Sequence, residues 1–399
     1  MKRAFVSARR ARGFTLVELM VALSGGLFLS VVVFALARDA SRFYQRETRL
    51  ASATLAGITG FERLKADIQR ASYLTTPNIR VDQLVRPNTS GITDLAGLLI
   101  EPGGSNITGN AAFGVNKSAG QELDPDAIVL AGSYAATDEF PGSIDGSGTR
   151  ITLSANSPSL ARLGFFATSD AAIKLKLIEN VFGVGRILRF LEISSRYQSY
   201  GVIASVTVNA SSMPQITLAS PLSYVQGFGE GSSVNVVNRV RYRIASKTDI
   251  EDTTDAWKPL FDASGDAPGE ADRTELVREE LDTADAVIAG TLDIAAEYAV
   301  DLEFGVTGET DPGTPLVYAS SSDKATFDKF FPATGRPQGV RAVRVRMSVR
   351  SREADREANI TGPGGGRIYR FKLGSDLGWA RVRTFQADVP LPNQATIQW

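Results

Sequence analysis

The sequence predicts an α+β protein in which one long N-terminal helix precedes a large antiparallel β-rich region. An apolar run of about 24 residues lies near the N-terminus, and amphipathic periodicity continues it without a proline before Pro77. Short alternating runs separated by Gly, Ser, Asn, Asp and Pro fill the rest of the chain. We therefore expect one anchor helix and one large domain.

The composition restricts the chemistry that is available to the protein. Of its 399 residues, 43% are hydrophobic and 22% are charged, and Cys and His are absent. Their absence excludes disulfides, the usual zinc sites, Cys nucleophiles and a Ser-His-Asp triad. No carboxylate pair stands out as a glycosidase site, since separation in space cannot be read from this sequence. We expect a protein that is not an enzyme and that uses no cofactor or metal.

Positive charge is concentrated at the N-terminus of a chain whose net charge is −1. No acidic residue occurs among the first 12 positions, and the basic ones are Lys2, Arg3, Arg9, Arg10 and Arg12. Without these residues the body of the chain is mildly acidic, so it has no general attraction for nucleic acid or anionic lipid. We expect no nucleic-acid partner.

Residues 14–37 form the apolar segment. As a helix it spans about 36 Å, enough to cross a hydrocarbon core of about 30 Å. The basic cluster precedes it, so the positive-inside rule places the N-terminus in the cytoplasm and the body outside. Glu18 lies within this segment, and a charge near the membrane centre costs roughly 2.5–3.5 kcal/mol on insertion scales. We therefore expect a partner for its carboxylate.

The residues around Glu18 are Gly13-Phe14-Thr15-Leu16-Val17-Glu18, and they resemble the type III signal of type IV prepilins and pseudopilins. The resemblance implies a leader peptide at residues 1–13, cleavage between Gly13 and Phe14 by a prepilin peptidase, and N-methylation of Phe14. Phe14, Thr15 and Glu18 are then expected to act in assembly. The Glu18 carboxylate would pair with the cationic Phe14 amine of a neighbouring subunit and fix the axial register. The alternative is a plain signal-anchor helix with Glu18 at the interface.

The amphipathic half of the helix is expected at residues 38–75. Apolar residues recur there at spacings of three, four or seven, so the whole helix would extend over about 60 residues, or about 90 Å. They include Phe43, Leu50, Ile58, Phe61, Leu64 and Ile68. Gly25-Gly26 interrupts the apolar half, and two interpretations remain open: local melting on entry into a filament, or close packing of helices.

Residues 76–399 are expected to form an extracytoplasmic β-rich head. Between residues 342 and 350, valine and methionine alternate with arginine and serine, as in a half-buried antiparallel strand. The candidate strands are Ala127–Leu130, Arg150–Leu153, Arg186–Glu192, Gly201–Val208, Gln215–Leu218, Val234–Ile244, Glu275–Leu281, Tyr298–Phe304, Val340–Arg350, Arg367–Leu373 and Ala380–Val389.

Part of the head resembles the PilW type of minor pilin and, more distantly, the J-type minor pseudopilin. The resemblance covers about half of the chain and rests on the helix and on short pieces in matching order, at residues 240–244, 276–280, 296–302 and 339–345. It implies the type IV pilin fold, a long helix packed on an antiparallel sheet. Residues 80–222 have no counterpart, and we interpret them as an additional β-rich insertion.

Two glycine-rich or acidic segments are weak candidates for binding sites. Residues 362–366 are glycine-rich, but the Lys-Ser/Thr of a phosphate loop does not follow them. The acidic stretch Asp262 to Glu275 lacks the spacing of an EF-hand loop. A hairpin connection and a solvated loop are the favoured interpretations.

The resemblance implies a minor pilin that primes or caps a retractable type IV pilus and contributes to cell adhesion and twitching motility. The partners it implies are other minor pilins, the major pilin, the prepilin peptidase, the inner-membrane assembly platform and a tip adhesin. It also implies a bacterial inner-membrane, single-pass location before assembly, then a periplasm-spanning and extracellular fimbrium. The alternatives are a minor pseudopilin of a type II secretion system and a membrane-anchored adhesin that does not polymerise.

Overall fold

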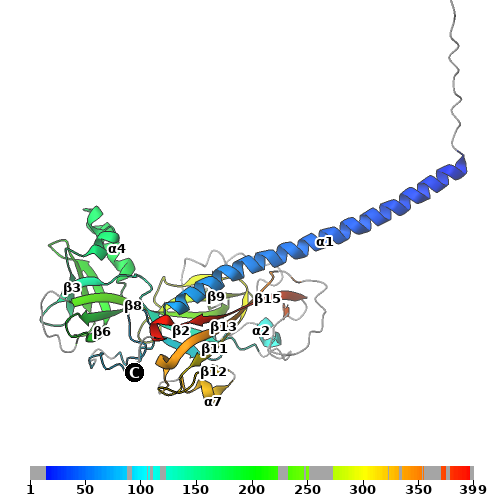
Figure 1. Cartoon of the computed structure of the whole chain (residues 1–399). Coiled ribbons are helices and arrows are strands. Elements are labelled where there is room, and N and C mark those ends of the chain that lie inside the picture. The colour runs from blue at the N-terminus through cyan, green and yellow to red at the C-terminus, as the bar shows by residue number, and fades with distance from the viewer. Residues whose placement is uncertain are drawn as a thin grey trace, which may run out of the picture. The chain divides into compact units, whose positions relative to one another are not determined.

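The structure is a computed structural model that describes residues 15–87, 92–105, 107, 111–116, 123–222, 232–246, 249–250, 273–321, 323–331, 335–352, 354, 370–373 and 378–395. A long helix precedes mostly antiparallel sheets, which agrees with the predicted α+β class (Figure 1). The helices are α1 (Leu16–Gln69), α2 (Ala111–Asn116), α3 (Pro158–Arg162), η2 (Phe165–Ala167), α4 (Ala171–Val181), α7 (Lys324–Phe327), η3 (Pro337–Gly339) and α8 (Pro392–Ala395). The strands are β1 (Leu98–Glu101), β2 (Ala127–Gly132), β3 (Phe140–Ile144), β4 (Arg150–Leu153), β5 (Ile187–Glu192), β6 (Gln198–Val208), β7 (Pro214–Leu218), β8 (Ser232–Ser246), β9 (Thr274–Leu281), β10 (Asp293–Ala296), β11 (Ala299–Gly308), β12 (Val317–Ser320), β13 (Val340–Arg350), β14 (Arg370–Lys372) and β15 (Trp379–Pro390).

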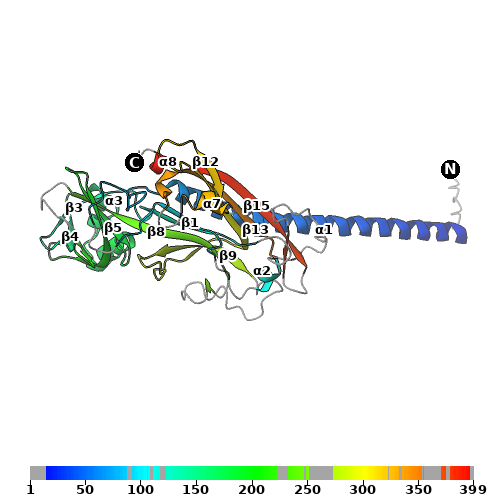
Figure 2. The same ribbon diagram turned by 90° about the horizontal axis from the view of Figure 1, so that it is seen from below.

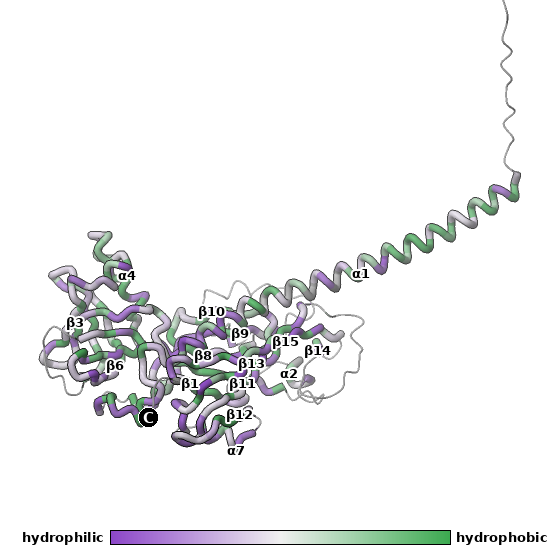
Figure 3. Tube along the Cα trace, in the orientation of Figure 1, coloured by the Kyte–Doolittle hydropathy of each residue, from purple (hydrophilic) through white to green (hydrophobic). Residues whose placement is uncertain are grey.

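The chain forms two compact units, Met1–Ala51 and Ser52–Trp399. In the first unit, the part of α1 from Leu16 to Ser41 is predominantly apolar, and this stretch is not buried against the protein. By length and composition it is sufficient to cross a membrane. Figure 3 shows this hydrophobic stretch of α1 giving way to mixed hydropathy. The helix is continuous across Gly25-Gly26, where an added Cβ would meet no atom within 4 Å.

The helix ends at Gln69, six residues before the predicted bound at residue 75. Residues 70–74 form turns, in which Ser72 and Leu74 have left-handed backbones with φ of 63° and 54°. Asn393 completes the end of the helix because its Nδ2 donates to the carbonyl oxygens of Gln69 at 3.2 Å and Ala71 at 3.1 Å. The apolar pattern continues to Ala71, so periodicity alone does not reveal this stop.

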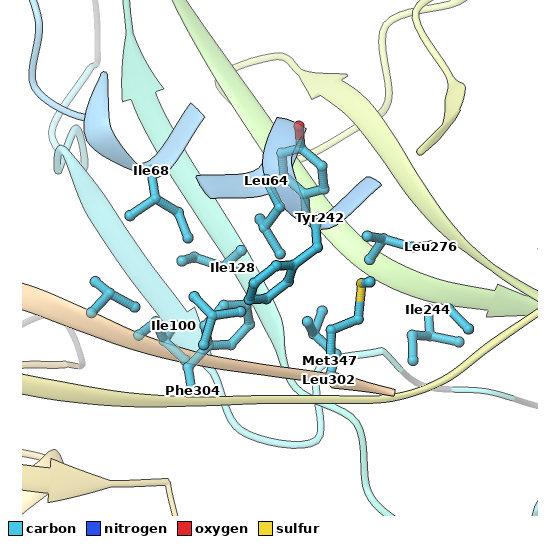
Figure 4. Packing of buried hydrophobic residues seen from close by; sticks show 14 of the residues in the cluster. Leu64, Ile68, Ile100, Ile128, Tyr242, Ile244, Leu276, Leu302, Phe304 and Met347 are labelled. Atoms are coloured by element: carbon cyan, nitrogen blue, oxygen red, sulfur yellow. The ribbon is translucent and has the colours of Figure 1, made fainter. Parts of the chain in front are cut away.

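Two antiparallel sheets and the C-terminal part of α1, from Phe61 to Ile68, enclose the main core. The first sheet has the order β1-β2-β8-β9-β10 and the second the order β12-β11-β13-β15-β14. Figure 4 shows side chains from α1 and from both sheets meeting in one cluster. The residues of this cluster include Leu64, Ile68, Ile100, Ile128, Tyr242, Ile244, Leu276, Leu302, Phe304 and Met347, each exposed by 2% or less.

A closed barrel is formed by β8, β3, β4, β7, β6 and β5, because β5 pairs again with β8. Residues 232–237 of β8 close the barrel, and residues 238–246 of the same strand pair with β2 and β9. Figures 1 and 2 show the barrel strands at one end of β8 and β9 beside the other. The barrel has its own core, which includes Phe140, Phe165, Ile178, Phe182, Ile203 and Ile216.

The barrel is inserted into a β-hairpin. β2 and the second half of β8 pair antiparallel, and their register ends at Gly132 opposite Asn238. The segment between these two positions therefore forms the insertion. The predicted insertion of residues 80–222 has different bounds in the structure, because β1 and β2 belong to the first sheet and the start of β8 completes the barrel.

Most predicted strands coincide with observed ones. All of the candidate strands overlap a strand, and the bounds of β4 and β13 were predicted without error. In β13 the valines and Met347 are buried as expected, but Ser348 and Arg350 on the other face are also buried. Arg350 lies over the rings of Tyr298 at 5.1 Å and Phe371 at 5.7 Å, so aromatic side chains cover its guanidinium.

Two buried carboxylates tie the first sheet to β11. Asp126 accepts hydrogen bonds from the backbone N–H groups of Phe304 at 3.0 Å and Gly103 at 3.1 Å, and Glu275 accepts one from Tyr298 at 3.1 Å. Burial raises the pKa of Asp126 to about 6 and that of Glu275 to about 8. Their desolvation is thus only partly offset, in Asp126 by these hydrogen bonds and in Glu275 chiefly by its ion pair with Arg273.

Within the second unit, the C-terminal part of α1 packs closely on two strands at two glycines. A Cβ on Gly60 would lie 2.4 Å from the carbonyl oxygen of Ala295 and 2.6 Å from the Cβ of Ala296 in β10. A Cβ on Gly57 would lie 2.4 Å from the ring of Phe385 in β15. The contact of Gly60 is with backbone, which cannot rotate away as a side chain can.

We expect Gly60→Ala to destabilise the folded chain by about 1–3 kcal/mol, because the methyl group forces α1 away from β10. This loss exceeds the gain of about 1 kcal/mol in helix propensity. Chemical unfolding of the full chain in detergent measures the change. Gly114→Ala is the matched control, since Gly114 lies in α2 and an added Cβ meets no atom within 4 Å. Equal stability of the two variants would contradict close packing at Gly60.

Candidate assembly site

The predicted assembly residues Thr15 and Glu18 form a capping box at the start of α1. Glu18 N–H donates to Thr15 Oγ1 at 3.2 Å, and Thr15 N–H donates to Glu18 Oε2 at 2.9 Å. The Thr15 hydroxyl also donates to Glu18 Oε2 at 3.0 Å. Each side chain thus satisfies a backbone N–H that the first turn of a helix leaves without an intrahelical partner.

This geometry gives Glu18 a local role within its own chain. A carboxylate in the first turn also interacts favourably with the helix dipole. Gly13 and Phe14 lie outside the described residues, so the predicted cleavage and the pairing of Glu18 with a Phe14 amine stay predictions. The structure therefore brings Thr15 and Glu18 together.

The capping box could have been predicted from the sequence. Thr15-Leu16-Val17-Glu18 fits the pattern of Ser or Thr followed three residues later by Glu or Gln, directly before an apolar run. The resemblance to prepilins implies a partner for Glu18 on another subunit. The hydrogen-bonding capacity of Thr15 points to a partner within the chain.

A second polar site fixes the other end of α1 to the first sheet. Asp67 is buried, and its Oδ2 accepts hydrogen bonds from Tyr242 Oη at 2.8 Å and from Arg278 Nε at 2.9 Å. Tyr134 Oη donates to the backbone carbonyl of Asp67 at 2.9 Å. A charged, hydrogen-bonded pair thus holds the helix within an otherwise apolar interface.

The two tyrosines remain neutral donors. Burial, followed by the negative charge of Asp67, raises the pKa of Tyr242 and of Tyr134 well above the ordinary value. A neutral hydroxyl donates to a carboxylate, whereas a phenolate would repel it. Both tyrosine hydroxyls therefore remain hydrogen-bond donors at any physiological pH. Sequence reasoning missed this site because its partners lie 175 and 211 residues away.

The arginines on the strand faces form ion pairs within the chain. Arg241 and Arg243 both contact Glu279, at 2.5 and 2.8 Å, in the first sheet. In the second sheet, Arg344 contacts Asp388 at 2.7 Å and Arg346 contacts Asp301 at 3.3 Å. Among the described residues, no group of three or more acidic side chains is placed to hold a metal ion.

The start of α1 is capped, its first part is apolar and of membrane length, and its C-terminal part packs in a large β-rich domain. These features fit a membrane-anchored precursor of the type IV pilin class. The family model that matches the chain describes the prokaryotic N-terminal methylation motif and covers residues 8–24. This motif indicates a type IV pilin-like or pseudopilin precursor and implies interaction with the assembly machinery, including the prepilin peptidase. No curated protein and no solved structure matches the chain.

Proposed function

We propose that the protein is a PilW-type minor pilin, a structural and non-catalytic subunit that primes or caps a type IV pilus. The methylation motif carries this proposal, because it runs without interruption into the apolar part of α1. A processed pilin needs both parts: a cleavage signal and a helix that leaves the membrane to enter a filament. The length and apolar character of α1 are compatible with the second and support the proposal.

The proposed location follows from the same two features. The precursor crosses the bacterial inner membrane once with its N-terminus in the cytoplasm, since the basic cluster precedes the apolar segment. Cleavage after Gly13 and methylation of Phe14 produce the mature subunit. It then joins the major pilin and other minor pilins through the assembly platform, and it spans the periplasm as part of a surface fibre.

The inserted barrel favours a minor subunit over a major one. It adds a second core to the head, and repeating it in every subunit would crowd a filament built from this chain alone. A subunit present in few copies at a filament end tolerates such an insertion. Contributions to adhesion and motility, including contact with a tip adhesin, follow from this position.

A minor pseudopilin of a type II secretion system is the second candidate, because the same motif serves both systems. Neighbouring genes separate the two: a retraction ATPase favours the pilus, and a secretin-linked export cluster favours secretion. An anchored adhesin that does not polymerise is a third. It would stay with the membrane when surface filaments are sheared off.

We expect Gly13→Val to abolish processing, because a branched side chain replaces the glycine at the proposed cleavage site. Intact-mass measurement of wild-type protein should show a chain that begins at methylated Phe14, and the variant should retain residues 1–13. Ala11→Val, two residues earlier, serves as the control and should be processed normally. A wild-type mature chain that still begins at Met1 would overturn the proposed function.

A further inference from the structure

The outer edge of β15 is open over most of its length. On one side β15 pairs with β13 along residues 382–390, and on the other side it pairs with β14 only at residues 379–381. Beyond Arg381, no strand among the described residues pairs with this second side. From there on, β15 is an edge strand of the second sheet.

The direction of the backbone groups of β15 follows from the bonds at its two ends. The N–H of Ser351, just after β13, donates to the Arg381 carbonyl oxygen at 2.8 Å. At the other end, the Leu391 N–H donates to the Arg341 carbonyl oxygen at 2.9 Å. Because backbone groups alternate in direction along a strand, the odd-numbered residues of β15 face β13.

The even-numbered residues of β15 therefore direct their backbone groups away from β13. Ala380 does so toward its partner Phe371 in β14. Pro390 lacks an N–H and ends the row of donors. Between them, the N–H and C=O groups that face outward belong to Val382, Thr384, Gln386 and Asp388. Such a row is a template for one further strand.

The burial of the side chains agrees with an open edge. Met347 in the middle of β13 is fully buried, whereas its cross-strand neighbour Phe385 on β15 is only half-buried. The side chains of Thr384, Gln386 and Asp388, on the opposite face of β15, are exposed. No part of the protein thus covers β15 from the side as β15 covers β13.

α1 presents apolar side chains beyond this edge. The Phe61 ring packs on Phe385, with the centroids 5.7 Å apart, and Gly60 faces β10. At about 100° per residue, Ile58 and Leu55 lie about 60° and 120° from Phe61, on the side away from Gly60. Their exposed fractions are 43% and 70%. The space beside β15 therefore has an apolar wall on the side of the helix.

A strand added at this edge would have different surroundings on its two faces. Side chains on one face would lie beside Phe385 and cover Ile58 and Leu55, so apolar residues fit there. Side chains on the other face would lie beside Thr384 and Gln386, where polar residues fit. We propose that the outer edge of β15 binds an extended segment of another protein, about seven residues long, in which apolar and polar side chains alternate.

A second copy of this chain fits the edge less well. α1 runs in the same direction as β15, since Phe61 packs on Phe385 and the Gln69 carbonyl accepts from Asn393 after the strand. Two identical edges pair antiparallel about a two-fold axis, which would reverse one α1 relative to the other. Subunits that this helix anchors in one membrane share its direction.

The test uses a fluorescently labelled peptide, Thr-Val-Lys-Val-Thr-Val-Lys, and measures its binding to the full chain in nanodiscs by fluorescence anisotropy. Two further peptides carry N-methyl groups on alternate residues, one in each phase. Only one side of an added strand faces β15, so one methylated peptide should bind at least about tenfold more weakly than the parent peptide and the other about equally. No binding of the parent peptide at millimolar concentration, or the same effect of both methylation phases, overturns the proposal.

A pair of variants at one position assigns the binding to β15. Gln386→Pro removes an outward N–H and leaves the bonds to β13 intact, and it should weaken binding of the parent peptide at least about tenfold. Gln386→Ala retains the N–H and should bind the peptide like wild type. Equal binding by the two variants would contradict the proposal.

Ile58→Lys tests the side of the helix without a change in the strand. It should weaken binding of the parent peptide about threefold or more, because an apolar contact is lost. Val184→Lys, at a side chain 58% exposed in the barrel, is the control and should change nothing. Equal affinities of these two variants would contradict the contact with α1.

Light scattering without peptide tests the competing occupant. The chain in nanodiscs should have the same oligomeric state as its Gln386→Pro variant. A dimer that Gln386→Pro dissociates would assign the edge to a second copy and overturn the proposal.

Discussion

Asp67→Ala is expected to lower the free energy of unfolding of the second unit by about 3–5 kcal/mol, the usual cost of breaking a buried pair from one side. Arg278 would remain buried with a side-chain exposure of 13% and without the carboxylate that neutralises it. Tyr242 would lose its acceptor at the same time. Such a loss is a large fraction of the stability of a typical domain. Chemical unfolding followed by tyrosine and tryptophan fluorescence measures it.

Two controls separate the buried pair from a general effect of removing charge from α1. Glu62→Ala removes an exposed carboxylate whose partner Lys65 lies three residues away, and it should cost at most about 0.5 kcal/mol. Tyr242→Phe removes one hydrogen bond to Asp67 and should give an intermediate loss of about 1–3 kcal/mol. If Asp67→Ala is as stable as Glu62→Ala, the Asp67 site does not hold the helix.

Glu18→Ala and Glu18→Gln distinguish the two roles of this residue. Glutamine also completes a capping box, so Glu18→Gln keeps the helix start and loses only the charge. Alanine loses both. If Glu18 pairs with the Phe14 amine of a neighbouring subunit, both variants should enter filaments at least about tenfold less than wild type, because an unpaired charge then lies among apolar helices.

The measurement is the ratio of the protein in sheared surface filaments to that in the membrane fraction. Intact mass must show a methylated Phe14 in both variants, which confirms that processing is intact. Thr15→Ser retains both the capping hydroxyl and the charge, and it should assemble like wild type. Normal assembly of Glu18→Gln beside poor assembly of Glu18→Ala would assign the residue to capping and contradict the pairing.

Elements with strong local patterns could be predicted from the sequence. An apolar run followed by amphipathic periodicity, without a proline, predicts α1. The alternation of valine with polar residues predicts β13. Weak patterns failed for physical reasons. β3 contains Pro141 and Gly142, a pair that predicts a turn. In the structure both residues lie in the strand and pair with β8. β10 consists of Asp, Ile and two Ala, residues of mostly low β-propensity.

Long-range contacts were beyond prediction, whereas a local signal was missed at α4, as it was at the capping box of Thr15 and Glu18. The neighbours of Asp67 come from strands far along the chain, and one-dimensional periodicity carries no information about them. The sequence does contain a start signal for α4, because Asp170 is a favoured N-cap residue and an amphipathic run follows it. In the structure Asp170 accepts a hydrogen bond from the N–H of Ala172 at 2.8 Å. The prediction of a wholly β-rich insertion is therefore wrong at α4.

The placement of the barrel has a consequence for how this protein can diversify. Gly132 and Asn238 face each other across two neighbouring strands, so the chain departs from the core sheet and returns to it at adjacent points. A tight reverse turn would bridge the same gap. Recombination at these two positions can therefore exchange one outer module for another while the anchor, the shared sheet and the Asp67 contact stay as they are.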